Sequence, residues 1–210
     1  MLRLSAVFLV SLLALGASAV TVDRIAAVVD RQVLTVSEVS QMVELRFFVR
    51  SSESDDDHRH DVLDALIAQA LRYRDAERFG EQDIAADTIE ARLVEIQGRF
   101  ASAEEFNAAL ARTELTLDEV RALVKRQLQV EAYIQERFAP LVFVSNEDID
   151  TYYRGPWSEQ RRARGLAVPP LAAVREEVRA AVRSSRLQSE VDRWTAQLRE
   201  RANVDVYAWR

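Results

Sequence analysis

Residues 22–39, with the sequence VDRIAAVVDRQVLTVSEV, constrain the fold more than any other stretch of the chain. Their first part is β-branched and apolar, Asp30 and Arg31 form a polar break, and a second strand-like run follows. That order predicts a short β-hairpin. Thr35 or Ser37 can cap a helix that begins directly after the hairpin.

Residues 1–19 have the composition of an export signal. Arg3 supplies a positive start, an uncharged and mostly apolar run follows, and a small-x-small cleavage pattern ends at Ala19. Cleavage there leaves a mature chain that begins at Val20 and has no membrane anchor. The alternative is an uncleaved anchor, but a membrane-spanning helix needs about 20 apolar residues, and this apolar run is shorter.

The composition narrows the class of protein. The chain has no cysteine, a formal net charge of −6, 30% charged residues and five glycines. The lack of cysteine excludes a thiol nucleophile, a disulfide framework and a lipid anchor on cysteine. An acidic exported chain is a poor candidate for binding nucleic acid or an anionic membrane. High charge with little glycine favours long solvated helices over an all-β fold.

Apolar residues at steps of three and four predict a series of helices after the hairpin. Two patterns of the type S/T-x-x-E, at Ser102 and Thr116, are capping boxes that predict two helix starts. The polar run SSESDDDHRH at residues 51–60 predicts a mobile loop. The first predicted helix runs from the end of the hairpin to about residue 50, the second spans 61–79 and the third includes 89–96. The fourth starts after Ser102, the fifth spans 117–138, the sixth starts after Ser145 and the last spans 171–202.

Residues 154–209 divide into three parts, at 154–170, 171–202 and 203–209. The first, RGPWSEQRRARGLAVPP, holds two of the five glycines and three of the four prolines and predicts a linker. The second is the longest predicted helix, about 48 Å at 1.5 Å per residue. The third, NVDVYAW, alternates like a strand.

Three separated segments together resemble the SurA-type periplasmic chaperones and peptidyl-prolyl isomerases. The opening segment VDRIAAVVDRQVLTVSEV is similar to the start of that family. The stretches DVLDALIAQALRYRDAERFG and VFVSNEDIDTYY resemble the rest of its N-terminal chaperone region, and LQSEVDRWTAQLRERANVDVY resembles its final helix and strand. The resemblance covers most of the mature chain.

The resemblance implies a mainly α fold: a helical bundle of about six to seven helices, with a small β-sheet that joins the N-terminal hairpin to the C-terminal strand. Family members carry one or more parvulin isomerase domains before the last helix. Here only the linker occupies that interval, and a domain needs roughly a hundred residues. The expected parts are a signal peptide at 1–19, a chaperone region at 20–153, the linker at 154–170, and a helix and strand at 171–210 that complete the same domain.

No catalytic constellation emerges from the sequence. His58 and His60 are the only histidines, and they could form a metal site with neighbouring aspartates, but a solvated mobile loop is the favoured interpretation because a metal site needs rigid geometry. The basic cluster of Arg161, Arg162 and Arg164 reads as part of a soluble linker, with contact to an anion or a partner as the alternative. We therefore expect no metal, no cofactor and no catalytic residue.

The resemblance implies an ATP-independent periplasmic chaperone, a holdase that binds unfolded exported polypeptides, chiefly outer-membrane proteins, through an apolar groove. Flexible apolar and aromatic groups suit weak binding to many segments. Phe48 and Trp157 are favoured because one adjoins the inward-facing Phe47 and the other lies in the predicted linker. The candidate peptide-binding residues are Met42, Phe47, Phe48, Phe138, Tyr152, Tyr153 and Trp157.

Two other functions stay open at this point. The chain could be a dedicated interaction subunit for one envelope protein, which would have a single stoichiometric partner instead of many. It could also be a residual peptidyl-prolyl isomerase, although no parvulin-sized segment is left for one. The sequence also leaves a homodimer open.

Overall fold

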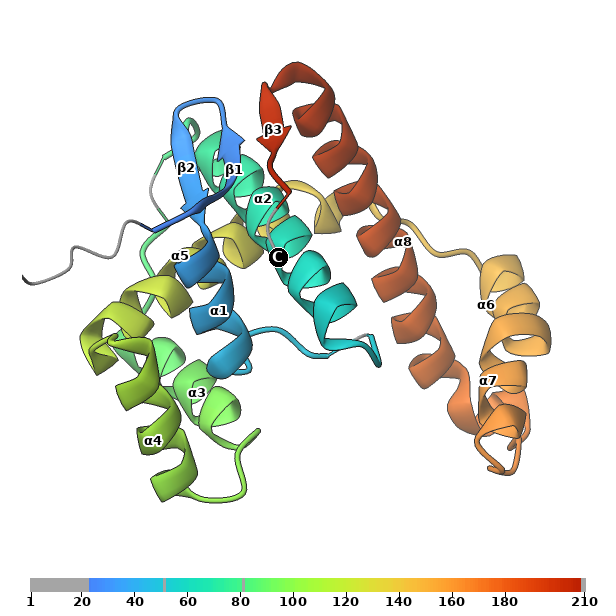
Figure 1. Ribbon diagram of the computed structural model, residues 1–210. Helices are drawn as coiled ribbons and strands as arrows, with labels where there is room; N and C mark the ends of the chain where they lie inside the picture. The colour runs from blue at the N-terminus through green and yellow to red at the C-terminus, as the bar shows by residue number, and fades with distance from the viewer. Residues whose placement is uncertain (1–22, 51, 81, 209–210) are drawn as a thin grey trace, which may run out of the picture.

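The computed structural model describes residues 23–50, 52–80 and 82–208, so the predicted signal segment at 1–19 lies outside the described residues. The described chain is mainly α-helical with one small sheet (Figure 1), which confirms the predicted fold class. The elements are β1 (Ile25–Val29), β2 (Gln32–Thr35), α1 (Val36–Glu44), α2 (Asp55–Glu77), α3 (Ala86–Gln97), α4 (Ala103–Thr113), α5 (Leu117–Arg137), η1 (Ala139–Leu141), α6 (Asn146–Tyr152), η2 (Tyr153–Trp157), α7 (Ser158–Ala163), α8 (Leu171–Arg201) and β3 (Val204–Val206).

The sheet joins the two ends of the described chain. Its strand order is β2-β1-β3, and both pairings are antiparallel. Ala27 in the central strand lies opposite Leu34 on one side and Val206 on the other. A two-stranded hairpin is marginal in water, so the strand at the end of α8 supplies stability that the hairpin lacks alone. The predicted pairing of the N-terminal hairpin with the C-terminal strand is confirmed.

Asp30, in the hairpin turn, ties the C-terminal strand in place. Its backbone has a φ of 53°, in the left-handed region. Its backbone N–H donates to the carbonyl oxygen of Asn203 at 2.8 Å, and its Oδ1 accepts from the Asn203 N–H at 2.9 Å. The other carboxylate oxygen pairs with Arg74 on α2. One side chain therefore connects the hairpin, the helix beneath it and the start of β3.

Helix α1 begins as predicted and ends earlier than predicted. Thr35 and Glu38 form a complete capping box at its start. The helix ends at Glu44 instead of near residue 50, because Arg46 adopts a left-handed φ of 49°. The Arg46 guanidinium lies over the ring of Phe100 and pairs with a carboxylate of α4, and these contacts turn the chain away from the helix axis.

The predicted loop at residues 51–60 is wrong for most of its length. Helix α2 starts at Asp55, with Ser54 as a cap whose side chain accepts from the backbone N–H of Asp57. Acidic side chains in a first helical turn are stabilised by the partial positive charge of the helix N-terminus. The acidic run that predicted a loop is therefore a helix start, and His58 is buried in it.

Helix α5 is the centre of the main core. It packs against both α2 and α3. Val120 and Val124 on this helix have no exposed surface. The main core also includes the inner face of the sheet and buried side chains of α1 and α4.

Helix α8 follows its predicted range and connects two apolar clusters. Its second half packs on α2, and its first half packs on α6 and η2, away from the sheet (Figure 1). The interval 154–170, predicted as a linker, contains a kinked turn and α7, because Trp157 is buried against α8. The Tyr153 hydroxyl donates to the carbonyl oxygen of Pro169 at 2.7 Å and closes this interval on itself.

Candidate peptide-binding groove

A groove lies where the C-terminal ends of α2 and α5 meet the second half of α8. Its volume is about 470 Å³, within the range of pockets that enclose small ligands. Two of its four apolar lining residues follow the last turns of α2 and α5, and the other two belong to α8. They are Phe79, Phe138, Trp194 and Leu198.

An aromatic cluster forms one side of the groove. It consists of Phe79, Tyr133, Phe138 and Trp194. The ring centre of Tyr133 lies 5.5 Å from those of Phe79 and Trp194, and the Phe138 and Trp194 rings are 5.1 Å apart. Tyr133 is 4% exposed, whereas Phe79 is 58% exposed. The cluster therefore extends from the interior to the solvent and can offer an aromatic surface to a peptide.

Local structure explains why these rings meet. Phe79 follows the last turn of α2, and Gly80, with a φ of 111°, ends that helix. Phe138 is the C-terminal cap of α5, just before Pro140. Trp194 is held from α8 by its Nε1–H, which donates to Oδ2 of Asp75 at 3.1 Å. Two helix ends and one helix side are thus brought to a common point.

Polar and charged side chains form the rest of the lining. Seven of the eleven lining residues are polar or charged, so this groove is amphipathic. The physical reason is that the C-terminal ends of α2 and α5 meet the second half of α8 here, and arginine is favourable near a helix C-terminus. The charged members are Asp75, Arg78, Arg137, Glu190, Arg193 and Arg201.

Tyr133 carries a buried hydroxyl that has no hydrogen-bond partner among the described residues. Burial raises the pKa of this phenol above its ordinary range, and Arg137 acts in the opposite direction. A buried hydroxyl without a partner costs about 1–3 kcal/mol. The ring of Tyr133 thus stabilises the aromatic cluster while its hydroxyl does not.

We therefore predict that Tyr133→Phe leaves the free energy of unfolding unchanged or raises it by about 1 kcal/mol. Urea denaturation followed by circular dichroism measures this change. Tyr133→Ala is the control and should lose about 3–5 kcal/mol, because it removes the ring as well. A loss above about 1 kcal/mol in Tyr133→Phe would mean that the hydroxyl has a partner, such as a bound water.

The seven residues predicted to bind peptide lie in three separate places, and Phe138 alone lines the groove. Met42 and Phe47 are buried in the main core, where Phe48 packs against them from its edge. The Phe47 and Phe48 ring centres are 5.5 Å apart in an edge-on arrangement. Met42 and Phe47 therefore present almost no surface to a peptide in this structure.

The remaining three predicted residues belong to the small cluster between α6, η2 and α8. Trp157 is 6% exposed, and Tyr152 and Tyr153 are partly buried against the same cluster. Arg161 lies over the Trp157 ring, 4.9 Å from its centre. The linker position that favoured Trp157 as a peptide contact is occupied by folded structure, which encloses the ring.

The sequence did not single out Phe79, Arg137 or Trp194 as site residues. Trp194 matched the periodic apolar face of the last helix, and Phe79 stood beside the glycine that ends α2. The sequence signal that could have identified Phe79 is its position directly before the glycine that ends the helix, because an aromatic residue at that position need not face the core. These three side chains come together only through long-range packing of the helices, which no local sequence pattern predicts.

Both histidines lie in the first turns of α2. His58 is buried, and His60 lies beside the backbone oxygen of Asp56. Over residues 23–50, 52–80 and 82–208, no three His, Cys, Asp or Glu side chains are grouped so that they could hold a metal ion. In the same ranges, no helix combines the length and the apolar character needed to cross a membrane.

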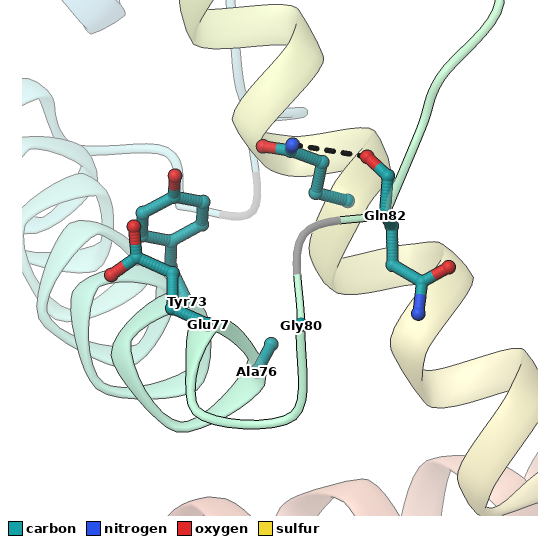
Figure 2. A pocket seen from close by; sticks show the side chains of 6 residues that line it. Tyr73, Ala76, Glu77, Gly80 and Gln82 are labelled. Carbon is teal, nitrogen blue, oxygen red and sulfur yellow. Dashed lines mark hydrogen bonds between the residues drawn. The ribbon is translucent and has the colours of Figure 1, made fainter.

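A second, much smaller cavity lies under the turn after α2 (Figure 2). Its volume is about 10 Å³, which is room for roughly one water molecule. Gln129 on α5 donates from Nε2 to the carbonyl oxygen of Gln82 at 3.1 Å and holds the turn against α5 (Figure 2). This cavity is a feature of the turn and is too small for a peptide side chain.

Comparison with known proteins gives a consistent set of relatives, although no family model matches the chain. The chain is 27% identical over 181 residues to the chaperone SurA of Pseudomonas putida and 26% identical over 180 residues to that of Pseudomonas aeruginosa. The chaperone SurA of Saccharophagus degradans is 26% identical over 146 residues. The chain is similar to the SurA chaperones. The first two matches cover 81% and 80% of the chain, so the SurA-like region includes most of it.

The same matches cover only part of the SurA relatives. They span 42%, 43% and 34% of the three relatives' own length. Between α6 and α8 of the SurA-like chain, the structure has only η2, α7 and a short connection. A further domain of about a hundred residues does not fit in that interval.

Proposed function

We propose that this chain is an ATP-independent chaperone of the periplasm, a holdase that binds unfolded exported polypeptides, including outer-membrane proteins. The observation that carries the proposal is the aromatic cluster exposed in a groove of a SurA-like fold. The relatives are named chaperones, and binding of unfolded chains needs accessible apolar surface. Export follows from the signal-like residues 1–19.

The dimensions of the groove suit a short extended segment better than a folded domain. A space of about 470 Å³ takes a few side chains at a time. Phe79 is exposed enough to contact such a segment, and Phe138 and Trp194 line the same groove, with their rings packed on each other. Small contact area gives weak binding, which lets a holdase release its client without nucleotide hydrolysis.

The proposed organisation is one domain closed by its own ends and without a parvulin insert. Residues 20–153 form the chaperone region, and 171–210 return α8 and β3 to it. Residues 154–170 are a short folded connection in the place of an isomerase domain. We therefore expect no catalysis of proline isomerisation on a short peptide.

Suppression of aggregation tests this function directly. An unfolded outer-membrane protein is diluted from urea with and without a molar excess of the chaperone, and light scattering is followed. We expect a lower scattering amplitude, and a weaker effect for Phe79→Ser. Phe143→Ser is the matched control, because Phe143 is 76% exposed and lies outside the groove lining. Unchanged scattering at excess chaperone would refute the proposal.

A dedicated interaction subunit for one envelope protein is the second candidate. The polar and charged lining of the groove favours it, because charge pairing gives specificity more than bulk affinity. Affinity capture from a periplasmic extract separates the two functions. Many substoichiometric clients indicate a holdase, whereas one stoichiometric partner indicates a dedicated subunit.

A further inference from the structure

The charges in the groove are not balanced. Four guanidinium groups and two carboxylates line it. Asp75 accepts from the Trp194 indole and lies 3.8 Å from Arg78, and Glu190 pairs with Arg193 at 2.8 Å. Both carboxylates are thus engaged, although the chain as a whole carries a net charge of −6.

Arg137 and Arg201 are the two guanidinium groups that remain. Neither forms an ion pair with a carboxylate within the described ranges. Arg137 ends α5 and Arg201 ends α8, and both side chains belong to the groove lining. Asp75 and Glu190 are already engaged, so the guanidinium groups of Arg137 and Arg201 can receive the anionic groups of a ligand.

Arg137 is oriented by the aromatic cluster. Its guanidinium carbon lies 4.7 Å from the centre of the Phe79 ring and 5.9 Å from that of Tyr133. A guanidinium that stacks on rings uses its flat face, and its N–H donors at the edge stay available for a carboxylate. Stacking also holds the side chain in place, which reduces the entropy lost when a ligand binds.

The helix ends oppose these charges only in part. Each helix C-terminus carries about half a negative charge, and this effect is screened by solvent and falls off within the last turn. A guanidinium is a full positive charge at the tip of a long side chain. We conclude that the side-chain charge dominates inside the groove, at the position where a ligand would lie.

We infer that the groove selects polypeptide segments in which an aromatic side chain is flanked by carboxylates. The aromatic side chain of the ligand packs against Phe79 and Phe138, and Arg137 and Arg201 receive the flanking Asp or Glu residues. The inference rests on the proposed function, because it names the segments that the same groove holds. It makes Arg137 and Arg201 specificity-determining residues.

Three fluorescein-labelled peptides of equal length test the inference. Each has one central Trp in a Gly-Ser background, and the Trp is flanked by two Asp, two Asn or two Lys residues. Fluorescence anisotropy gives each Kd at about 20 mM and 300 mM salt. We expect the Asp peptide to bind about five- to tenfold tighter than the Lys peptide at low salt. The difference should shrink at high salt, since exposed charges are screened.

Two double variants assign the preference to the groove. Arg137→Gln with Arg201→Gln should reduce the Asp-over-Lys preference below about twofold and leave the Kd of the Asn peptide within about threefold. Arg162→Gln with Arg164→Gln removes the same charge from exposed positions outside the groove and should keep the preference. Thermal unfolding confirms that each variant is folded.

The outcomes separate this inference from the proposed function. Equal binding of all three peptides overturns the charge selection and leaves the holdase function standing. A preference that survives in the Arg137 and Arg201 variant also overturns it. If none of the peptides binds and aggregation is not suppressed, the proposed function fails as well.

Discussion

Replacing Trp194 with alanine is expected to lower the free energy of unfolding by about 3–5 kcal/mol, the usual loss for a buried aromatic residue. Trp194 is 9% exposed and packs against Tyr133 and Phe138. Its indole N–H also holds Asp75 on α2, so the substitution removes a hydrogen bond between two helices. Urea denaturation followed by circular dichroism at 222 nm measures the loss.

A second substitution at Trp194 separates the contribution of the ring from that of the N–H, and a substitution at the surface serves as the control. Trp194→Phe keeps a ring against Tyr133 and Phe138 and loses the N–H, so we expect a loss of about 1–2 kcal/mol. Leu141→Ala is the surface control, because Leu141 is 76% exposed, and it should change stability by less than about 0.5 kcal/mol. A loss below about 1 kcal/mol in Trp194→Ala would mean that α8 is not held to the body through this cluster.

The ends of the fold were predictable because their signals are local. The hairpin, the helix cap at Thr35 or Ser37 and the alternation at the C-terminus each depend on a few neighbouring residues. The pairing of β1 with β3 joins distant segments, and it came from the resemblance to the SurA-type family. The local patterns alone would have given a hairpin and a C-terminal strand with no pairing between them.

Two predicted irregular segments are helical for reasons that composition does not report. The polar character of the acidic run before His58 predicts a loop, whereas Ser54 caps this run as the first turn of α2. Glycine and proline predicted a linker after Tyr153, whereas burial of Trp157 folds that interval onto α8. In both cases a cap or a tertiary contact outweighed the average character of the segment.

The groove was the least predictable part of the molecule. It is made of side chains from the ends of α2 and α5 and the side of α8, and of the predicted candidates it includes Phe138. Aromatic residues near a helix end can face either the core or the solvent, and sequence spacing does not distinguish the two. Arg78, Arg137 and Arg201 occupy positions at helix ends where arginine is common, so the sequence does not show that their positive charges meet in one groove.

Asp30→Ala is expected to lower the free energy of unfolding by about 2–3 kcal/mol, although the side chain is at the surface. About 1 kcal/mol comes from placing alanine at a φ of 53°. About 1 kcal/mol comes from the lost hydrogen bond to the Asn203 N–H. The ion pair with Arg74 is partly exposed and adds up to about 1 kcal/mol.

The conservative substitutions at the same position show which of these contributions holds the two ends together. Asp30→Gly keeps the left-handed backbone without strain and should lose about 1 kcal/mol less than Asp30→Ala. Asp30→Asn keeps both the backbone preference and an acceptor for Asn203, so its loss should stay below about 1 kcal/mol. The Tyr207 N–H donates to the carbonyl oxygen of Ala26 across the β1–β3 pair. Its hydrogen exchange should quicken most in Asp30→Ala, less in Asp30→Gly and least in Asp30→Asn. If all three variants behaved alike, the closure of the chain would depend on the backbone pairing and not on this aspartate.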